Sequence, residues 1–373
     1  MLQQHKSHIE NTYFVNLDAL RFFAATAVML FHYILFFNDQ QEYGWFYQNF
    51  FQYIIKRGHL GVNFFFVLSG FLITYLIILE INKNTKFDIW AFLIRRILRI
   101  WPLYFLAVSI MFCLVFYFPI YGETNHDIKY FMFFLSNFNE IINGENDSYG
   151  MLTIPWSVSI EEQFYLFFAL IILPFQKQIK NFRYILWLLI AIGLVFLIIH
   201  FDNNRIRYYH TVPALIDLSF GAIVAFLFYY KSKIIDLIKS LSKTHKIILM
   251  FVFVIFIVFK NKIFDHGVII ALERPFIAII FSFIIIMSTS NKLIFGRFHN
   301  KLQYLGKISY GIYMYHMVIL FLFELFIKKH NINFDYSIIF ITFMAILTIL
   351  VSHWSYKYFE KVFLRLKSNF RKV

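Results

Sequence analysis

The stretch Asn16–Tyr33, NLDALRFFAATAVMLFHY, sets the interpretation of the whole chain, because it places an acid, a base and a histidine in an otherwise apolar helical segment. Asp18 and Arg21 are three residues apart and can therefore meet on one helix face. His32 follows Arg21 by eleven residues, so both side chains share a face roughly 16 Å apart along the axis. These three residues could also have structural roles, as a helix cap, a snorkelling arginine and an internally hydrogen-bonded histidine. However, ionisable residues inside membrane spans usually mark functional sites.

The composition predicts an integral membrane protein. Of 373 residues, 60% are hydrophobic and 15% are charged, whereas soluble domains are about 45–50% apolar and about 25% charged. Connections between apolar segments are too short for a second domain, so we expect one all-α domain over 1–373, a polytopic bundle of about ten transmembrane helices. The first span is expected to be retained, because no small-residue cleavage site follows it. The expected spans are 18–38, 60–80, 97–119, 155–175, 183–200, 210–230, 246–260, 267–289, 308–328 and 336–357.

The basic residues follow the membrane boundary, so the net charge of +14 does not indicate a nucleic-acid-binding protein. With both termini on one side, that side collects 23 Lys and Arg residues. The positive-inside rule then predicts cytoplasmic termini in the cytoplasmic (inner) membrane and an external connection at 120–154, whose apolar run is interfacial or re-entrant. The external loops hold nine basic residues: Lys56, Arg57, Lys129, Arg205, Arg207, Lys260, Lys262, Lys328 and Lys329.

Neither a disulfide nor a metal site is expected. The single cysteine, Cys113, lies in an apolar run and has no partner for an internal disulfide. The thirteen histidines are scattered, and no H-E-x-x-H motif occurs.

Three arginines precede the third span, in FLIRRILRIWPLYF. Arg95 and Arg99 are four residues apart on one face, and Arg96 lies beside them. They could set topology or bind anionic lipid heads. Because the guanidinium fork also suits phosphate, they could instead anchor a cytosolic phosphate-bearing substrate, with Tyr104 following in the same motif.

The second span opens with GHLGVNFFFVLSGFLIT. Gly58, Gly61, Gly70 and Ser69 allow close packing between helices. Alternatively, the backbone and hydroxyl at Ser69–Gly70 line a substrate passage.

The fourth span carries adjacent carboxylates in PWSVSIEEQFYLFF. Glu161 and Glu162 lie roughly 9–10 Å inside the external end, and His32 lies at a similar depth of about 9 Å. A histidine is a base suited to neutral pH, and a carboxylate can hold its tautomer. The two side chains point about 100° apart, so only one of the two glutamates is expected to share the direction of His32.

Other ionisable residues are expected to form internal hydrogen-bonded pairs. They are His316 in KISYGIYMYHMVI, His210, Asp217, Glu273–Arg274 and His353.

Together, these motifs resemble the membrane acyltransferase-3 family from residue 16 to 361. The matching motifs are Leu17–Arg21 with His32, Gly61–Ile73, Arg95–Tyr104, Trp156–Tyr165, Ser309–His316 and, loosely, Tyr356–Lys361. Two departures are Asn63, where the family commonly has an aspartate, and Val362, where it commonly has a proline. A carboxylate role at Asn63 is therefore in doubt.

The resemblance implies an enzyme that transfers an acyl group, with acetyl expected, from cytosolic acyl-CoA to a hydroxyl or amine of an envelope carbohydrate. Acyl-CoA is then a co-substrate and no permanently bound cofactor is expected; the other partners are membrane lipids. No appended esterase-like domain is expected after the last span. In the family motif the first glutamate is the better match for a functional residue, so Glu161 is expected to face the His32 cavity and Glu162 to pair with a cation on a neighbouring helix. The catalytic candidates are His32 and Glu161, the donor-binding candidates are Arg21, Arg95, Arg96, Arg99 and Tyr104, and the acceptor or supporting candidates are Asp18, Asn63, Ser69, Glu162 and His316.

A transporter or flippase for a glycan or lipid-linked sugar is the alternative, because intramembrane charges suit it as well. Transporters often contain inverted repeats with paired broken helices, and the sequence has no such pairing. A membrane scaffold would leave the intramembrane histidine and glutamates without a purpose.

Overall fold

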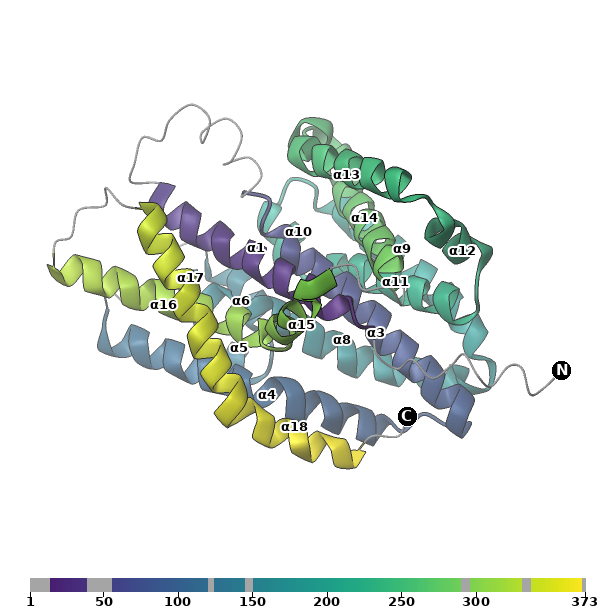
Figure 1. Ribbon diagram of the computed structural model, residues 1–373, viewed down its shortest axis with the longest axis horizontal. Coiled ribbons are helices and arrows are strands. Elements are labelled where there is room, and N and C mark those ends of the chain that lie inside the picture. The colour runs from purple at the N-terminus through teal and green to yellow at the C-terminus, as the bar shows by residue number, and fades with distance from the viewer. Residues whose placement is uncertain are drawn as a thin grey trace.

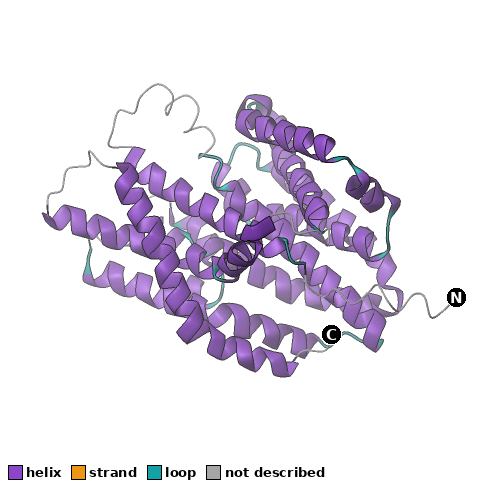
Figure 2. Ribbon diagram, in the orientation of Figure 1, coloured by secondary structure: helices purple, strands orange, loops and turns teal. Residues whose placement is uncertain are grey.

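The computed structural model describes residues 14–38, 56–119, 124–144, 150–289, 296–330 and 337–370. Within these ranges every regular element is helical and no strand occurs (Figure 2). The long helices are α1 (Leu17–Asn38), α3 (Leu60–Asn84), α4 (Ile89–Tyr117), α8 (Trp156–Ile172), α9 (Phe182–Ile199), α11 (Thr211–Tyr229), α13 (Lys243–Ile263), α14 (Glu273–Ser288), α16 (Ser309–His330) and α17 (Ser337–Ser355). The short ones are α5 (Ile128–Met132), α6 (Ser136–Ile142), α7 (Gly150–Thr153), α10 (Asn204–Tyr209), α12 (Lys233–Ser240), α15 (His299–Lys307) and α18 (Lys361–Lys367).

The described helices form an all-α membrane bundle, as the composition predicted. Eight helical stretches are long and apolar enough to cross a membrane, and one of them, Gly150–Ile199, contains both α8 and α9. A long helix occupies each of the ten expected spans. The difference concerns α13, expected to span at 246–260: it is a helix of 21 residues, but it is not among the eight stretches.

Helix α3 is central to the bundle and packs against α1, α11 and α14 (Figure 1). Glycines allow the closest of these contacts. A Cβ added to Gly70 would collide with the carbonyl oxygen of Leu218 in α11, and one added to Gly221 would collide with that of Val67 in α3. The packing role predicted for the glycine-rich second span is therefore confirmed at Gly70.

The C-terminal helices return across the bundle. Helix α17 continues through the π-helical turn Tyr356–Glu360 into α18, which packs along α4 (Figure 1). This brings the end of α18 beside the arginines of α4.

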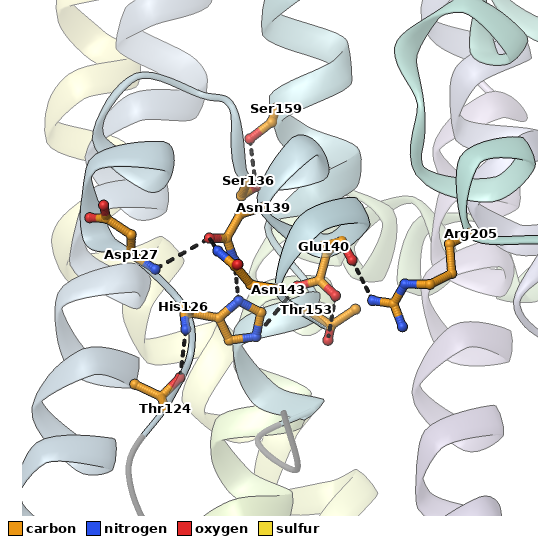
Figure 3. A network of polar contacts seen from close by, with 10 residues as sticks. All are labelled: Thr124, His126, Asp127, Ser136, Asn139, Glu140, Asn143, Thr153, Ser159 and Arg205. Carbon is orange, nitrogen blue, oxygen red and sulfur yellow. Dashed lines mark hydrogen bonds and ion pairs between the residues drawn. The ribbon is translucent and has the colours of Figure 1, made fainter. Parts of the chain in front are cut away.

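The described part of the connection 120–154, predicted to be external, folds around a buried polar network (Figure 3). The His126 ring bonds to the side chain of Asn139 and lies 3.6 Å from the Glu140 carboxylate. The Ser136 and Ser159 hydroxyls, 2.7 Å apart, tie α6 to α8. The apolar run 130–135 belongs mainly to the five-residue helix α5 and the turn after it, so it does not span the membrane.

A labelling experiment tests the predicted topology. In a Cys113→Ala background, a membrane-impermeant thiol reagent added outside intact cells is expected to label Asn125→Cys and to spare Ser242→Cys; both native side chains are exposed. Permeabilised cells provide the control, in which both positions should react. Labelling of Ser242→Cys alone in intact cells would contradict cytoplasmic termini. Asn146, in the same external connection, lies outside the described residues.

Candidate active site

Two cavities lie inside the bundle and share part of their wall. The large cavity has a volume of about 790 Å³ and is lined by His32, among others. The small cavity has a volume of about 110 Å³ and is lined by Arg21, among others. Val62 of α3 and Tyr313 of α16 line both cavities. These two side chains therefore form the partition between them.

Helix α1 joins the two cavities. Arg21 and His32 lie on the same face, as their spacing predicted, and each contributes to a different cavity. The Arg21 guanidinium is 2.5 Å from the Asp18 carboxylate, which confirms that the pair meets on one face. Asp18 thus holds the arginine at the small cavity.

In the large cavity, His32 pairs with a second histidine rather than with a glutamate. Nε2 of His316 lies 3.2 Å from Nδ1 of His32. His316 is fully buried, and its Nδ1 is 2.6 Å from the carbonyl oxygen of Tyr313. The expected internal bonding of His316 is therefore confirmed, and its partner is His32.

Carbonyl contacts define the tautomers of both histidines. Nδ1 of His32 lies 2.9 Å from the carbonyl oxygen of Val28. A carbonyl only accepts hydrogen bonds, so Nδ1 carries the hydrogen in His32 and, by the same argument, in His316. Nε2 of His32 then keeps a free lone pair and can accept a proton.

A buried ion pair lies behind the wall of the large cavity. Asn63 donates a hydrogen bond of 3.1 Å to Asp217, and Arg274 donates one of 2.7 Å to the same carboxylate oxygen. Asp217 is fully buried, whereas Asn63 and Arg274 line the cavity. Asn63 thus contacts the carboxylate of Asp217 in α11, and the expected pairing of Asp217 is confirmed.

Arginines from two helices gather at the small cavity. Arg96 and Arg99 of α4 line it together with Arg21 of α1. The Arg96 guanidinium lies 5.5 Å from the centre of the Tyr165 ring. Guanidinium groups at a cavity of this kind suit a phosphate-bearing ligand.

Two of the expected donor-binding residues lie elsewhere. Arg95 is 3.1 Å from Glu80 and donates a 2.7 Å hydrogen bond to the carbonyl of Phe370, so it anchors the chain's C-terminal segment instead of lining the cavity. Tyr104 is fully buried and donates to the carbonyl of Phe131 at 3.0 Å, which ties α4 to the external connection. The helical spacing located the arginine cluster correctly, but it did not show which arginine an acidic neighbour would engage.

The structure also corrects the expected positions of the two glutamates. Glu161 lines the small cavity, where it accepts hydrogen bonds from Ser69 at 2.8 Å and Tyr165 at 2.7 Å. It does not line the large cavity with His32. Glu162 accepts a 2.8 Å hydrogen bond from the Trp101 indole, in place of the expected ion pair with a cation. Depth along a helix was estimated without knowing how α8 is rotated in the bundle.

The sequence analysis did not single out Tyr313 at the cavities or Lys367 beside the arginines of α4. Tyr313, one turn before His316, forms part of the partition, and its hydroxyl lies 2.7 Å from that of Ser157. Its place in the S-Y-x-I-Y-x-x-H motif was the available signal. Lys367 at the end of α18 lies close enough to Arg96 and Arg99 to interact electrostatically with them. No local pattern links Lys367 to α4, because the contact depends on the return of α18.

The described residues contain no group of three or more histidine, cysteine, aspartate or glutamate side chains placed to hold a metal ion.

Comparisons with known proteins place the chain in a family. It is 30% identical over 371 residues to the O-acetyltransferase OatA of Staphylococcus aureus, covering 93% of this chain and 57% of that protein. It is 30% identical over 336 residues to the peptidoglycan O-acetyltransferase OatA of Listeria monocytogenes, covering 83% of this chain and 49% of that protein. A putative O-acetyltransferase of S. aureus is also 30% identical, over 380 residues, with 94% and 57% coverage.

The chain thus spans about half the length of the curated relatives it matches. No solved structure matches it. Residues 14–356 match the family 3 acyltransferase domain, which is nearly the whole described chain. As its motifs predicted, this integral membrane protein belongs to the acyltransferase-3 family.

Proposed function

We propose that the protein is an O-acyltransferase of the cytoplasmic membrane that moves an acyl group, with acetyl expected, from cytosolic acyl-CoA to a hydroxyl of an envelope carbohydrate. One observation carries the proposal: Arg21 and His32 of one helix line two cavities that share Val62 and Tyr313 as a common wall. The predicted topology puts the small cavity toward the cytoplasm, where acyl-CoA is made. The names of the OatA relatives favour O-acetylation and, in one case, peptidoglycan as the acceptor.

In the proposed reaction, the arginines of the small cavity hold the phosphates of coenzyme A. The thioester reaches the partition, and the acceptor hydroxyl lies beside His32 in the large cavity. Nε2 of His32 takes the hydroxyl proton as the oxygen attacks the thioester carbonyl. The new C–O bond forms, the C–S bond breaks, and the thiolate of coenzyme A leaves and takes up a proton.

A covalent route uses the same groups in a different order. Nε2 of His32 first attacks the thioester, the C–S bond breaks, and the thiolate of coenzyme A leaves and takes up a proton. The acceptor hydroxyl then attacks the acyl-imidazole, the N–C bond breaks, and the hydroxyl proton passes to the released imidazole. Incubation of the protein with labelled acetyl-CoA and no acceptor separates the routes. Label that is retained by the wild-type protein and not by His32→Ala indicates the covalent step, whereas no retained label indicates direct transfer.

The activity itself is tested with the purified full chain in proteoliposomes. Acetyl-CoA is supplied on the side of the termini and an envelope glycan extract on the other side. We expect release of free coenzyme A that depends on the glycan, and we expect acetyl ester in the glycan by mass spectrometry. Movement of unmodified glycan without release of coenzyme A would favour a transporter and contradict the proposal.

The two neighbouring glutamates provide a matched pair of variants. Glu161→Gln removes the negative charge that accepts hydrogen bonds from Ser69 and Tyr165 beside the arginines, so we expect transfer to fall at least about tenfold, as for the loss of one or more charge-assisted hydrogen bonds. Glu162→Gln keeps an acceptor for the Trp101 indole and should retain most activity. Transfer rates and thermal stability are measured side by side. An inactive Glu162→Gln beside an active Glu161→Gln would reverse the assignment.

A further inference from the structure

The large cavity carries more positive charge than a neutral sugar hydroxyl requires. Five cationic side chains line it, against two carboxylates. The cations are Arg57, Arg205, Arg207, Lys260 and Arg274, and the carboxylates are Asp265 and Glu273. Some of this charge is balanced internally, since Lys260 pairs with Glu273 and Arg274 pairs with the buried Asp217.

The cations of the large cavity are also exceptions to the overall charge bias. Only nine Lys and Arg residues fall in the external loops, and four of them line this one cavity: Arg57, Arg205, Arg207 and Lys260. The positive-inside rule favours basic residues on the other side of the membrane. Their concentration around one cavity therefore has a cause other than topology.

The arginines of α10 are held in place by neighbouring backbone and amide groups. Arg205 donates to the carbonyl oxygen of Glu140 in the polar network of the external connection (Figure 3). Arg207 donates a 3.2 Å hydrogen bond to the side chain of Asn204. In each arginine the Nε atom is buried, with no hydrogen-bond partner among the described residues. Since buried donors are normally satisfied, both guanidinium groups have hydrogen-bonding capacity that the described residues do not use.

Aromatic rings complete the wall next to α10. The Trp156 ring lies 4.9 Å from the Tyr208 ring and 5.2 Å from the Tyr209 ring, and all three residues line the cavity. Their apolar faces suit the C–H face of a sugar, while the arginines suit an anion beside it. The volume of about 790 Å³ lies in the usual range of pockets for small ligands.

We propose that the acceptor is an acidic carbohydrate, in which a carboxylate or phosphate close to the acylated hydroxyl binds Arg205 and Arg207. This inference rests on the proposed function, because it names the chemical class of the same acceptor. The planar guanidinium groups bind the anion through charge-assisted hydrogen bonds. The anion then fixes the sugar so that one hydroxyl faces Nε2 of His32.

Binding without any acyl donor tests the charge requirement. The full chain in nanodiscs of phosphatidylcholine is titrated with three disaccharides: chitobiose, its uronic acid and its 6-phosphate. We expect one or both charged sugars to bind at least tenfold more tightly than chitobiose, with an affinity that falls as salt is added. The uronic acid and the phosphate distinguish the two sources of charge. If neither charged sugar binds more tightly than chitobiose, the inference is overturned.

Variants locate the effect in the cavity. Arg205→Gln and Arg207→Gln, singly and together, should weaken binding of the charged sugar about 10-fold to 100-fold and leave chitobiose unchanged. The matched control is Arg183→Gln, an exposed arginine at the start of α9 that lines neither cavity. Thermal stability of each variant is recorded, and Arg207→Lys should recover part of the binding. An equal loss for charged and neutral sugars, or an equal loss in Arg183→Gln, would contradict a specific anion site.

Acyl transfer separates this inference from the proposed function. Acyl transfer to neutral and charged acceptors at equal rates would support the proposed acyltransferase activity and contradict the requirement for an acidic acceptor. Arginine-dependent binding of the charged sugar without any acyl transfer would support the anion site and contradict the proposed acyltransferase activity.

Discussion

His32→Ala is expected to lower acyl transfer by about 10²–10⁴-fold, the usual contribution of a general base. The His32 imidazole lines the large cavity and has a free lone pair on Nε2, because its Nδ1 hydrogen faces the carbonyl of Val28 and Nε2 of His316. Binding of acyl-CoA should stay within about twofold of wild type, since His32 does not line the small cavity. The measurement compares the rate of acetyl ester formation at saturating donor and acceptor.

Two other histidines serve as references for this variant. His353→Ala removes a histidine that bonds to Tyr304 outside both cavities, and it should keep most activity. His316→Gln removes the partner of the His32 ring and should lower the rate less than His32→Ala does, because the base itself remains. Full acyl transfer by His32→Ala would end the proposed mechanism.

Arg96→Ala and Arg99→Ala are expected to raise the KM for acyl-CoA by about 10-fold to 100-fold each, as expected for losing a charge-assisted hydrogen bond to phosphate. Both arginines line the small cavity, whereas Arg95 is engaged by Glu80 and by the carbonyl of Phe370. Arg95→Ala is therefore the matched control. It should lower thermal stability, because Glu80 loses its cation, and it should change the KM for acyl-CoA much less.

Lysine substitutions sharpen this second test. Arg96→Lys and Arg99→Lys keep the charge but not the planar fork, so only part of the donor affinity should return. If Arg95→Ala raises the KM as much as Arg96→Ala does, the small cavity is not the donor site. Unchanged affinity in both Arg96→Ala and Arg99→Ala would make these arginines topology anchors only.

Local spacing predicted the parts of the site that belong to one helix. Asp18, Arg21 and His32 all lie on α1, and helical periodicity was enough to place the ion pair and the shared face. The span positions followed from apolar length, which depends on the membrane and not on tertiary contacts. The family resemblance rested on motifs that follow one another along this chain in the family's order.

Groups that meet across helices could not be placed in this way. The estimated depth in the membrane predicted that Glu161 lies near His32. In the structure, however, the rotation of α8 directs Glu161 toward Ser69 and the arginines of the small cavity. The acidic partner of Arg95 comes from α3, fifteen residues earlier in the chain. The anion-binding site proposed in the large cavity combines α10 with a network from the external connection, and no single stretch of sequence contains it.

The partition formed by Val62 and Tyr313 has an electrical consequence for the proposed reaction. The acceptor hydroxyl loses its proton on one side of these residues, and the thiolate of coenzyme A gains a proton on the other side. A proton passed inward from His32 leaves each turnover electroneutral. A proton released outward makes each turnover move one positive charge out of the cell, which costs about 2.3 kcal/mol for every 100 mV of membrane potential. The path of that proton therefore decides whether envelope acylation slows as the membrane becomes more polarised.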